Sequence, residues 1–339
     1  MTLPADLETT WLPVALARAI KARPVRREVA GHPIVLWRSP DGIRAFRDRC
    51  PHRNYPLSEG RVENGQLVCA YHGWRFSGDG ACNEVPGCAR DGLSRQSLSR
   101  LGAEPLAVAE LDGAVFVRVA GGVDDWAATL PPMPNETDFD HFWWAQRPTP
   151  ARVYDALDNV LDPFHTNFIH DGLIRTKGRR QPVVQTLRAA ERSFEVTYAQ
   201  GADYGWMSRV LEGARSQSRG YYYPPVVFQG HWEGPKGLNL CVTLWFVPEN
   251  ATSLRTMARF STPKSKGPAW LKETLIRLFL VQVIEQDRRA LQHQYGNIAR
   301  FGGPKFKAGP GDRLTDRLTT LYQGGRLEPG EAGPFHMEL

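Results

Sequence analysis

The sequence has no apolar stretch long enough to cross a membrane. Its most apolar run, residues 275–284, contains Arg277 and Gln282 and is shorter than the roughly 20 residues that a spanning helix needs. Residues 1–23 have no uninterrupted apolar core followed by a small-residue cleavage site, which argues against a secretory signal. We therefore expect a cytoplasmic protein without a membrane span.

Cysteine is scarce, with five residues in a chain of 339. Small secreted domains that depend on disulfides are much richer in cysteine. Cys82 and Cys88 are close enough in sequence to pair, but we interpret them as reduced core residues. The sequence therefore indicates no disulfide framework.

The chain also lacks a glycine-rich phosphate-binding strand–helix signature and the four-cysteine set of a ferredoxin. Any electrons from NAD(P)H must therefore reach it through a partner. The net charge of +6 is scattered along the chain rather than gathered with aromatic residues, which argues against nucleic acid. An acidic redox partner explains this charge better, although an ordinary solvated surface would look the same.

Two short segments each offer one thiol and one imidazole. They are Cys50-Pro51-His52 and, 16 residues after His52, Cys69-Ala70-Tyr71-His72. The gap suits a pair of strands. In a [2Fe–2S] cluster with mixed ligands, two thiolates hold one iron and two neutral imidazoles hold the other, which raises the reduction potential.

A structural zinc ion uses the same residue types and is the main alternative. Zinc fingers, however, usually separate their cysteines by about two to four residues and their histidines by about three to five. Here each segment mixes one cysteine with one histidine. The spacing therefore favours the iron–sulfur cluster.

A second group of polar residues follows in residues 155–172. Asn159, Asp162 and His165 recur every three residues among apolar neighbours, so on one helix they would form a polar ridge. His165 and His170 would point about 140° apart on an ideal helix. Both can face one metal only if the helix distorts or ends between them, and the pair 171–172 (Asp-Gly) favours an end.

Residues 268–300 have a helical pattern, with an acid on the apolar face. Asp287 lies on the stripe formed by Ile284, Leu291, Tyr295 and Ile298. A carboxylate there is costly unless it is paired or binds a metal. Two histidines and one carboxylate leave open positions on Fe(II) for oxygen and substrate, so His165, His170 and Asp287 are our candidate ligands. Taken alone, two histidines five residues apart are more often ordinary core or surface residues.

The remaining patterns indicate two domains. Residues 24–120 predict a small antiparallel β module with turns at 31–33, 40–42, 77–80 and 112–113. Residues 121–150 are rich in proline, glycine and aspartate and resemble an interdomain crossing. Residues 177–260 predict an antiparallel sheet, and residues 313–322 a short helix before a Pro- and Gly-rich end.

The Cys50–His72 motif, continued by Gly73 and Trp74, resembles the signature of Rieske-type non-heme iron oxygenases. The series from Asn159 to His170 is similar to their mononuclear-iron motif, and residues 284–287 resemble their downstream ligand segment. The resemblance implies an α+β fold, with an all-β Rieske [2Fe–2S] domain (1–145) followed by a helix-grip-like catalytic domain with a central antiparallel sheet (146–339). It also implies a terminal oxygenase of the monooxygenase and demethylase branch.

The resemblance implies further roles. Asp162 would bridge a cluster-bound histidine of one subunit to His165 of the next, which implies a homotrimer. The alternative for Asp162 is a helix cap or a local salt bridge. Asn159 would act only through a hydrogen bond near the iron.

The implied reaction uses O2 and electrons from an external NAD(P)H-dependent flavin reductase or ferredoxin to hydroxylate or oxidatively demethylate a small substrate. An apolar or aromatic ring is expected, since the predicted sheet carries Trp206, residues 221–223, Phe228, Trp232 and Trp245. Most of these could instead pack in the core. The basic residues Arg175, Lys177, Arg179 and Arg180 could attract an anion or simply be solvated.

Two alternatives stay open. The chain could be a Rieske electron carrier with a non-catalytic docking domain, or an oxidative cyclase or desaturase that uses the same iron chemistry.

Overall fold

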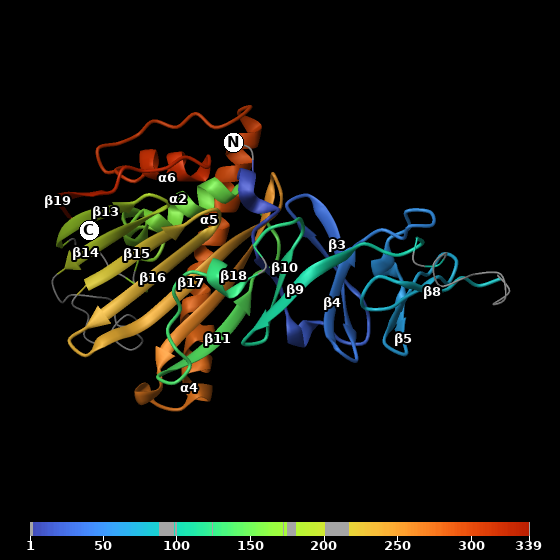
Figure 1. The fold of residues 1–339 in the computed structure, drawn as a ribbon. Helices are drawn as coiled ribbons and strands as arrows, with labels where there is room; N and C mark the ends of the chain where they lie inside the picture. Colours follow the sequence, from blue (N-terminus) through green and yellow to red (C-terminus); the bar gives the residue numbers. More distant parts are fainter. Residues whose placement is uncertain are drawn as a thin grey trace. The chain divides into compact units, whose positions relative to one another are not determined.

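The computed structural model of the chain describes residues 3–87, 98, 100–123, 125–171, 173–174, 181–200 and 217–338. The chain forms two compact units (Figure 1). One comprises residues 7–129 and 247–251, and the other residues 1–6, 130–246 and 252–339. The sequence predicts a domain boundary at 145. In the structure, strand β11 (Phe139–Ala145) pairs with β18 (Ser253–Pro263) and lies in the second of these units.

The first unit contains a six-stranded sheet in the order β1-β10-β9-β4-β3-β2, whose neighbours pair antiparallel. Its strands are Leu12–Leu16, Val25–Val29, His32–Ser39, Gly42–Arg47, Pro105–Leu111 and Ala114–Arg118 for β1, β2, β3, β4, β9 and β10. Short 3-10 turns η1, η2, η3 and η5 span Ala5–Leu7, Ala17–Ala19, Leu57–Glu59 and Ala127–Thr129.

Two hairpins of this sheet use turns with left-handed backbone. Asp112 and Gly113 have φ of 48° and 81°, so the predicted turn there is confirmed. The first hairpin turns one residue earlier than predicted, at Ala30 and Gly31, with φ of 54° and 83°. His32 is already the first residue of β3 and pairs with Val29 of β2, so the turn does not include Pro33.

A four-stranded sheet in the same unit carries the cysteine loops. Its strands β5 (Arg61–Glu63), β6 (Gln66–Val68), β7 (Arg75–Phe76) and β8 (Cys82–Glu84) lie in sequence order. The expected strand pair between His52 and Cys69 is therefore present as β5 and β6. Cys50 and Cys69 pack in one buried core with Trp37, Phe46 and Phe76.

The second unit is built on a nine-stranded sheet in the order β11-β18-β17-β16-β15-β14-β13-β19, with β12 (Thr149–Pro150) paired to β18. The other strands are Pro182–Ala190, Ser193–Gln200, Gln217–Tyr223, Val227–Gly234, Gly237–Asn250 and Gly330–Glu338 for β13 to β17 and β19.

Two details of this sheet differ from the predictions. The alternation in residues 221–228 predicts one strand, but these residues span the hairpin between β15 and β16. The Pro- and Gly-rich end contains strand β19, which pairs antiparallel with β13. Main-chain hydrogen bonds to an existing strand stabilise this segment despite its weak strand propensity.

Among the described residues, the helices are α2 (Val153–Leu161), α4 (Ala269–Leu275), α5 (Val281–Arg300) and α6 (Thr315–Tyr322), with 3-10 turns η6 (Phe164–Asn167) and η7 (Lys264–Lys266). A π-helical turn, η8 (Ile276–Leu280), joins α4 to α5, so the predicted helical region is continuous. In Figure 1, α5 runs behind the sheet and across its strands. In the described ranges, no helix combines the length and apolarity needed to cross a membrane.

Candidate metal centres

The two cysteine loops repeat one backbone pattern. The Cys50 N–H donates to the Tyr55 carbonyl at 2.9 Å, and the Cys69 N–H donates to the Trp74 carbonyl at 2.9 Å. Four residues after each cysteine, Asn54 and Gly73 donate back to its carbonyl and have φ of 58° and 73°. Each cysteine therefore lies at the same position of an equivalent loop.

The thiols of these loops are buried next to one another. Burial raises the pKa of Cys50 to about 11, and the neighbouring Cys69 contributes to the rise. The buried Cys50 thiol is costly to ionise without a cation, whereas a bound metal deprotonates a thiol outright.

The imidazoles form a second close pair. The ring centroids of His52 and His72 are 4.5 Å apart, and His52 stacks on Trp74 at 4.6 Å. Burial and the nearby His72 lower the pKa of His52, which favours the neutral form that binds metals. His52 Nδ1 is buried and has no hydrogen-bond partner among the described residues. An unpartnered ring nitrogen beside two thiols fits an iron–sulfur cluster.

The segment of the second site bends earlier than predicted. Helix α2 ends at Leu161, and Asp162 has extended backbone with ψ of 118°. Proline disfavours helical backbone at the residue before it, so Pro163 accounts for this end. Asn159, Asp162 and His165 therefore do not share one helical ridge. The predicted end at residues 171–172 was wrong, and residue 172 lies outside the described ranges.

The Asp162 carboxylate starts the next turn. It accepts the N–H groups of Phe164 at 2.8 Å and His165 at 3.3 Å. It thus serves as a cap for η6, which is the alternative that the sequence left open. This contact positions His165 beyond the end of α2.

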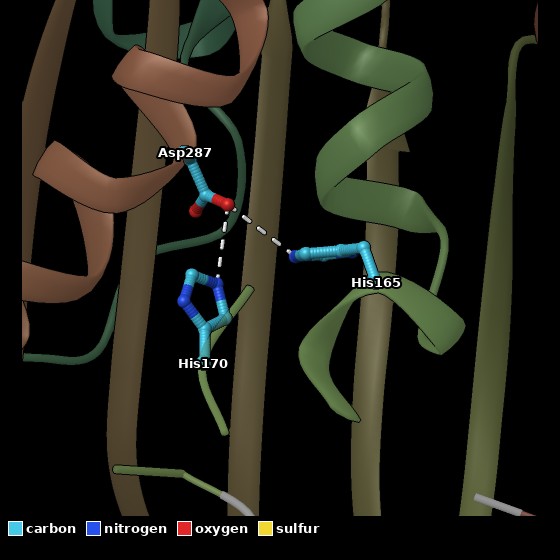
Figure 2. Close-up of side chains that lie close together, drawn as sticks. All are labelled: His165, His170 and Asp287. Atoms are coloured by element: carbon cyan, nitrogen blue, oxygen red, sulfur yellow. Dashed lines mark ion pairs between the residues drawn. The ribbon is translucent and has the colours of Figure 1, made fainter. Parts of the chain in front are cut away.

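Three candidate ligands meet although they come from distant segments. His165 Nε2 lies 3.4 Å and His170 Nε2 lies 3.1 Å from Asp287 Oδ1. One potential ligand atom from each residue lies within 4.8 Å of the others. Figure 2 shows the carboxylate on α5 facing both rings, one on η6 and one on the segment after it.

The far nitrogen of each ring is held by an acceptor. His165 Nδ1 donates to the Asp162 carbonyl at 2.6 Å, and His170 Nδ1 donates to Gln286 Oε1 at 2.9 Å. Each Nε2 therefore presents a lone pair towards Asp287. Three acceptor atoms that face one another fit a cation between them. Gln286 was not recognised from the sequence, although it stands beside the candidate ligand Asp287.

The pKa values of His165 and Asp287 show that this site favours positive charge beside the carboxylate. Burial lowers the pKa of His165, but the facing Asp287 outweighs it and the pKa is raised overall. Burial raises the pKa of Asp287, but the two histidines that face it have the larger effect, so the pKa of Asp287 is lowered overall.

These residues lie at a cavity of about 150 Å³. Apart from the three candidate ligands and Thr166, its lining is apolar and consists of Val160, Ile174, Phe228, Trp232, Leu240, Val242, Leu244, Phe260, Leu280, Val283 and Ile284. Asn159 does not line it but borders a smaller cavity of about 20 Å³ that also reaches Asp287.

The predicted aromatic lining is only partly present. Phe228 and Trp232 line the cavity, whereas Tyr222 and Trp245 are buried in the core. Tyr221 and Tyr223 line a different groove beside β13 and β14. Trp206 and the basic residues 175–180 lie outside the described ranges.

Comparisons with known proteins agree with this architecture. Residues 10–109 match the model of the Rieske [2Fe-2S] domain, and residues 151–310 match that of the vanillate O-demethylase oxygenase C-terminal domain. The crystal structure of dicamba monooxygenase bound to dicamba has the same fold, with a TM-score of 0.76 and 19% identity over 96% of this chain and 98% of that one.

Two curated proteins are similar in sequence. The 4beta-methylsterol monooxygenase of Methylococcus capsulatus is 27% identical over 91% of this chain and 86% of its own length. Pheophorbide a oxygenase of Oryza sativa subsp. japonica is 34% identical over 51% of this chain and 35% of its own length.

The chain spans 34% to 62% of the length of several chloroplastic relatives. Nevertheless, it contains both domains that define one group of oxidoreductases, and the two matched regions include all seven candidate metal ligands. Residues 10–109 and 151–310 thus give the chain the two domains found in Rieske-type non-heme iron oxygenases, the family with a [2Fe–2S] cluster and a mononuclear iron.

Proposed function

We propose that the chain is the terminal oxygenase of a multicomponent monooxygenase, which hydroxylates or oxidatively demethylates a small apolar or aromatic substrate. The observation that carries this proposal is the meeting of His165, His170 and Asp287 at an apolar cavity. Two histidines and one carboxylate leave coordination positions open for O2.

The proposal assigns seven ligands. Cys50 and Cys69 hold one iron of the cluster, and His52 and His72 hold the other. His165, His170 and Asp287 hold the mononuclear Fe(II), which supplies O2 activation when it is bound. The hydrogen bonds to His165 and His170 support this assignment, because they direct both Nε2 atoms to one point.

The cavity walls would determine what reacts. Their apolar side chains exclude water from the iron and favour a substrate part without charge. The Thr166 hydroxyl, which donates to the Pro163 carbonyl at 2.6 Å, is the one hydroxyl among the described lining residues.

Electron supply would come from outside the chain. We propose a ferredoxin or flavin reductase that draws on NAD(P)H. The exposed His72 supports access to the cluster. Transfer to the iron would run in a homotrimer, from His72 of one subunit through Asp162 to His165 of the next. A cytoplasmic location stays a prediction, and several relatives are chloroplastic.

Two alternatives make different predictions. An electron carrier with a docking domain would bind no iron at His165, His170 and Asp287. An oxidative cyclase or desaturase would keep both metals and differ only in its product.

Electron paramagnetic resonance on anaerobically purified protein tests the proposal. Dithionite reduction should produce a Rieske-type signal, and added nitric oxide a high-spin iron–nitrosyl signal. Asp287→Ala should remove the second signal and turnover while the first persists. If the iron-replete parent protein shows no iron–nitrosyl signal, the result would support the electron carrier instead.

A further inference from the structure

The cavity at the candidate iron site adjoins a second one. This second cavity measures about 120 Å³ and extends over β15 towards Asp162 and Ser218. The two cavities share five lining residues, Val160, Thr166, Ile174, Phe228 and Trp232. They are therefore adjacent along the same stretch of sheet and helix.

Two glycines face each other in the sheet beneath the shared region. Gly220 of β15 pairs with Gly230 of β16. Because side chains alternate along a strand, Phe228 and Trp232 lie on the same face as Gly230. The glycine pair thus leaves a recess between two aromatic residues.

The rings of Trp232 and Phe228 both lie in this recess. A Cβ atom on Gly230 would lie 2.7 Å from Cη2 and 2.8 Å from Cζ3 of Trp232. A Cβ atom on Gly220 would lie 3.1 Å from Cε2 of Phe228. Neither glycine has a positive φ, so backbone conformation does not require glycine here. Their lack of a side chain lets the rings lie against the sheet and leaves space above them.

We propose that the two cavities form one elongated substrate site whose depth is set by Gly220 and Gly230. The substrate would be a neutral molecule with two ring-sized parts, one at the iron and one over β15. This inference rests on the proposed function of the site. It makes the glycine pair a determinant of substrate size without contact to the metal.

The volumes support a two-part ligand. An apolar cavity of about 150 Å³ holds one benzene-sized molecule, and the second cavity is nearly as large. The charges at the second cavity are balanced by other groups of the chain. The Asp162 carboxylate accepts two main-chain N–H groups, and Arg219 forms ion pairs with Glu195 at 3.7 Å and Glu233 at 3.5 Å, although its Nε has no hydrogen-bond partner among the described residues. A neutral ligand is therefore favoured over an ion.

Binding to the oxidised holoenzyme tests this proposal without turnover. Two probes are used. N-phenyl-1-naphthylamine is a neutral fluorescent molecule with two aromatic parts, and its binding is measured by fluorescence. Toluene has one ring, and its binding is measured by calorimetry. In Gly230→Ala the new methyl group forces the Trp232 ring up into the site. We expect the naphthylamine to bind about tenfold more weakly, whereas toluene binding changes by less than about threefold.

Two further variants serve as controls. Gly330→Ala on β19 of the same sheet adds a methyl group with nothing within 4 Å and should leave both probes unaffected. In the double variant Gly230→Ala/Trp232→Leu the shorter side chain avoids the methyl group, so naphthylamine binding should recover. Gly220→Ala, which requires smaller shifts, replaces Gly230→Ala if the latter does not fold.

The outcomes separate this inference from the proposed function. Unchanged naphthylamine binding in folded Gly230→Ala, or equal weakening of both probes, would overturn the elongated site. Both iron signals should persist in the variant. A parent protein that binds the probes as expected but shows no nitrosyl signal would overturn the proposed function and not the shape of the site.

Discussion

Gln286 Oε1 lies 2.9 Å from Nδ1 of His170, while the neighbouring Asp287 faces Nε2 of the same ring at 3.1 Å. Two consecutive residues of α5 therefore contact both nitrogens of one buried imidazole. Gln286 accepts a hydrogen bond from the Nδ1–H group and so orients the lone pair of Nε2 towards the candidate iron position.

Gln286→Leu is expected to weaken Fe(II) binding about 10- to 100-fold, because His170 loses the acceptor that fixes its tautomer and orientation. Iron titration of metal-depleted protein, read by the nitrosyl signal, measures this loss. The cluster spectrum should not change, and Gln286→Glu, which keeps an acceptor, should retain iron. Gln282→Leu on an exposed part of the same helix is the matched control. Equal iron affinity in Gln286→Leu and the parent would exclude the positioning role.

Asp162 can be tested with two variants that separate its cap from its charge. Asp162→Ala removes the acceptor for the N–H groups of Phe164 and His165 and should cost about 1 kcal/mol of stability. Asp162→Asn keeps an acceptor oxygen and should retain both metals. If the carboxylate also carries electrons between subunits, single-turnover reoxidation of the cluster in the Asn variant should slow about tenfold or more, a barrier rise of about 1.4 kcal/mol. Parent-like reoxidation would leave Asp162 with the cap alone.

Gly60→Ala should disrupt the cluster domain. A Cβ atom at Gly60 would overlap the carbonyl oxygen of Val68 and lie 2.9 Å from that of Leu57, and both are backbone atoms that move little. Val68 precedes Cys69, so the cysteine loop would shift. We expect a loss of about 1–3 kcal/mol of stability and less cluster absorbance per chain. Gly121→Ala, where nothing lies within 4 Å, should match the parent. Full cluster content with unchanged stability in Gly60→Ala would contradict this account.

The raised pKa of the Asp158 carboxyl predicts how the stability of the protein depends on pH. Burial, followed by repulsion from Asp162 and Asp312, raises its pKa from 3.8 to about 6. Between these values the folded chain binds more protons at this group than the unfolded chain, so its contribution to stability falls as pH rises through this window. Above pH 6 the ionised carboxylate costs up to roughly 3 kcal/mol.

Asp158→Asn should therefore stabilise the protein above pH 6 and remove this component of its pH dependence. Urea unfolding midpoints of variant and parent between pH 4.5 and 7.5 measure the difference. A difference that does not widen from pH 4.5 to pH 6.5 would show that Asp158 is not desolvated as the structure indicates.

Local sequence determined much of the cluster region. Spacing indicated an iron–sulfur site at Cys50 and Cys69, and the Asp112-Gly113 turn followed from backbone preferences that act within a few residues. The family and the α+β fold were also predicted correctly from the motifs. Such features are set by residues that are close together in the chain, so they can be read from the sequence alone.

Other features depended on packing between distant segments. The end of α2 at Leu161 is an exception, since its cause is local: Pro163 was present in the sequence but was not used to predict this end. The hydrogen bond from His170 to Gln286, the pairing of β19 with β13 and the recess over Gly220 and Gly230 join residues far apart in sequence. The order of residues in the chain indicated the candidate ligands. Only the tertiary structure decided which atoms orient these ligands and how large the adjacent cavities are, because cavity volume and hydrogen-bond direction arise from contacts between distant segments.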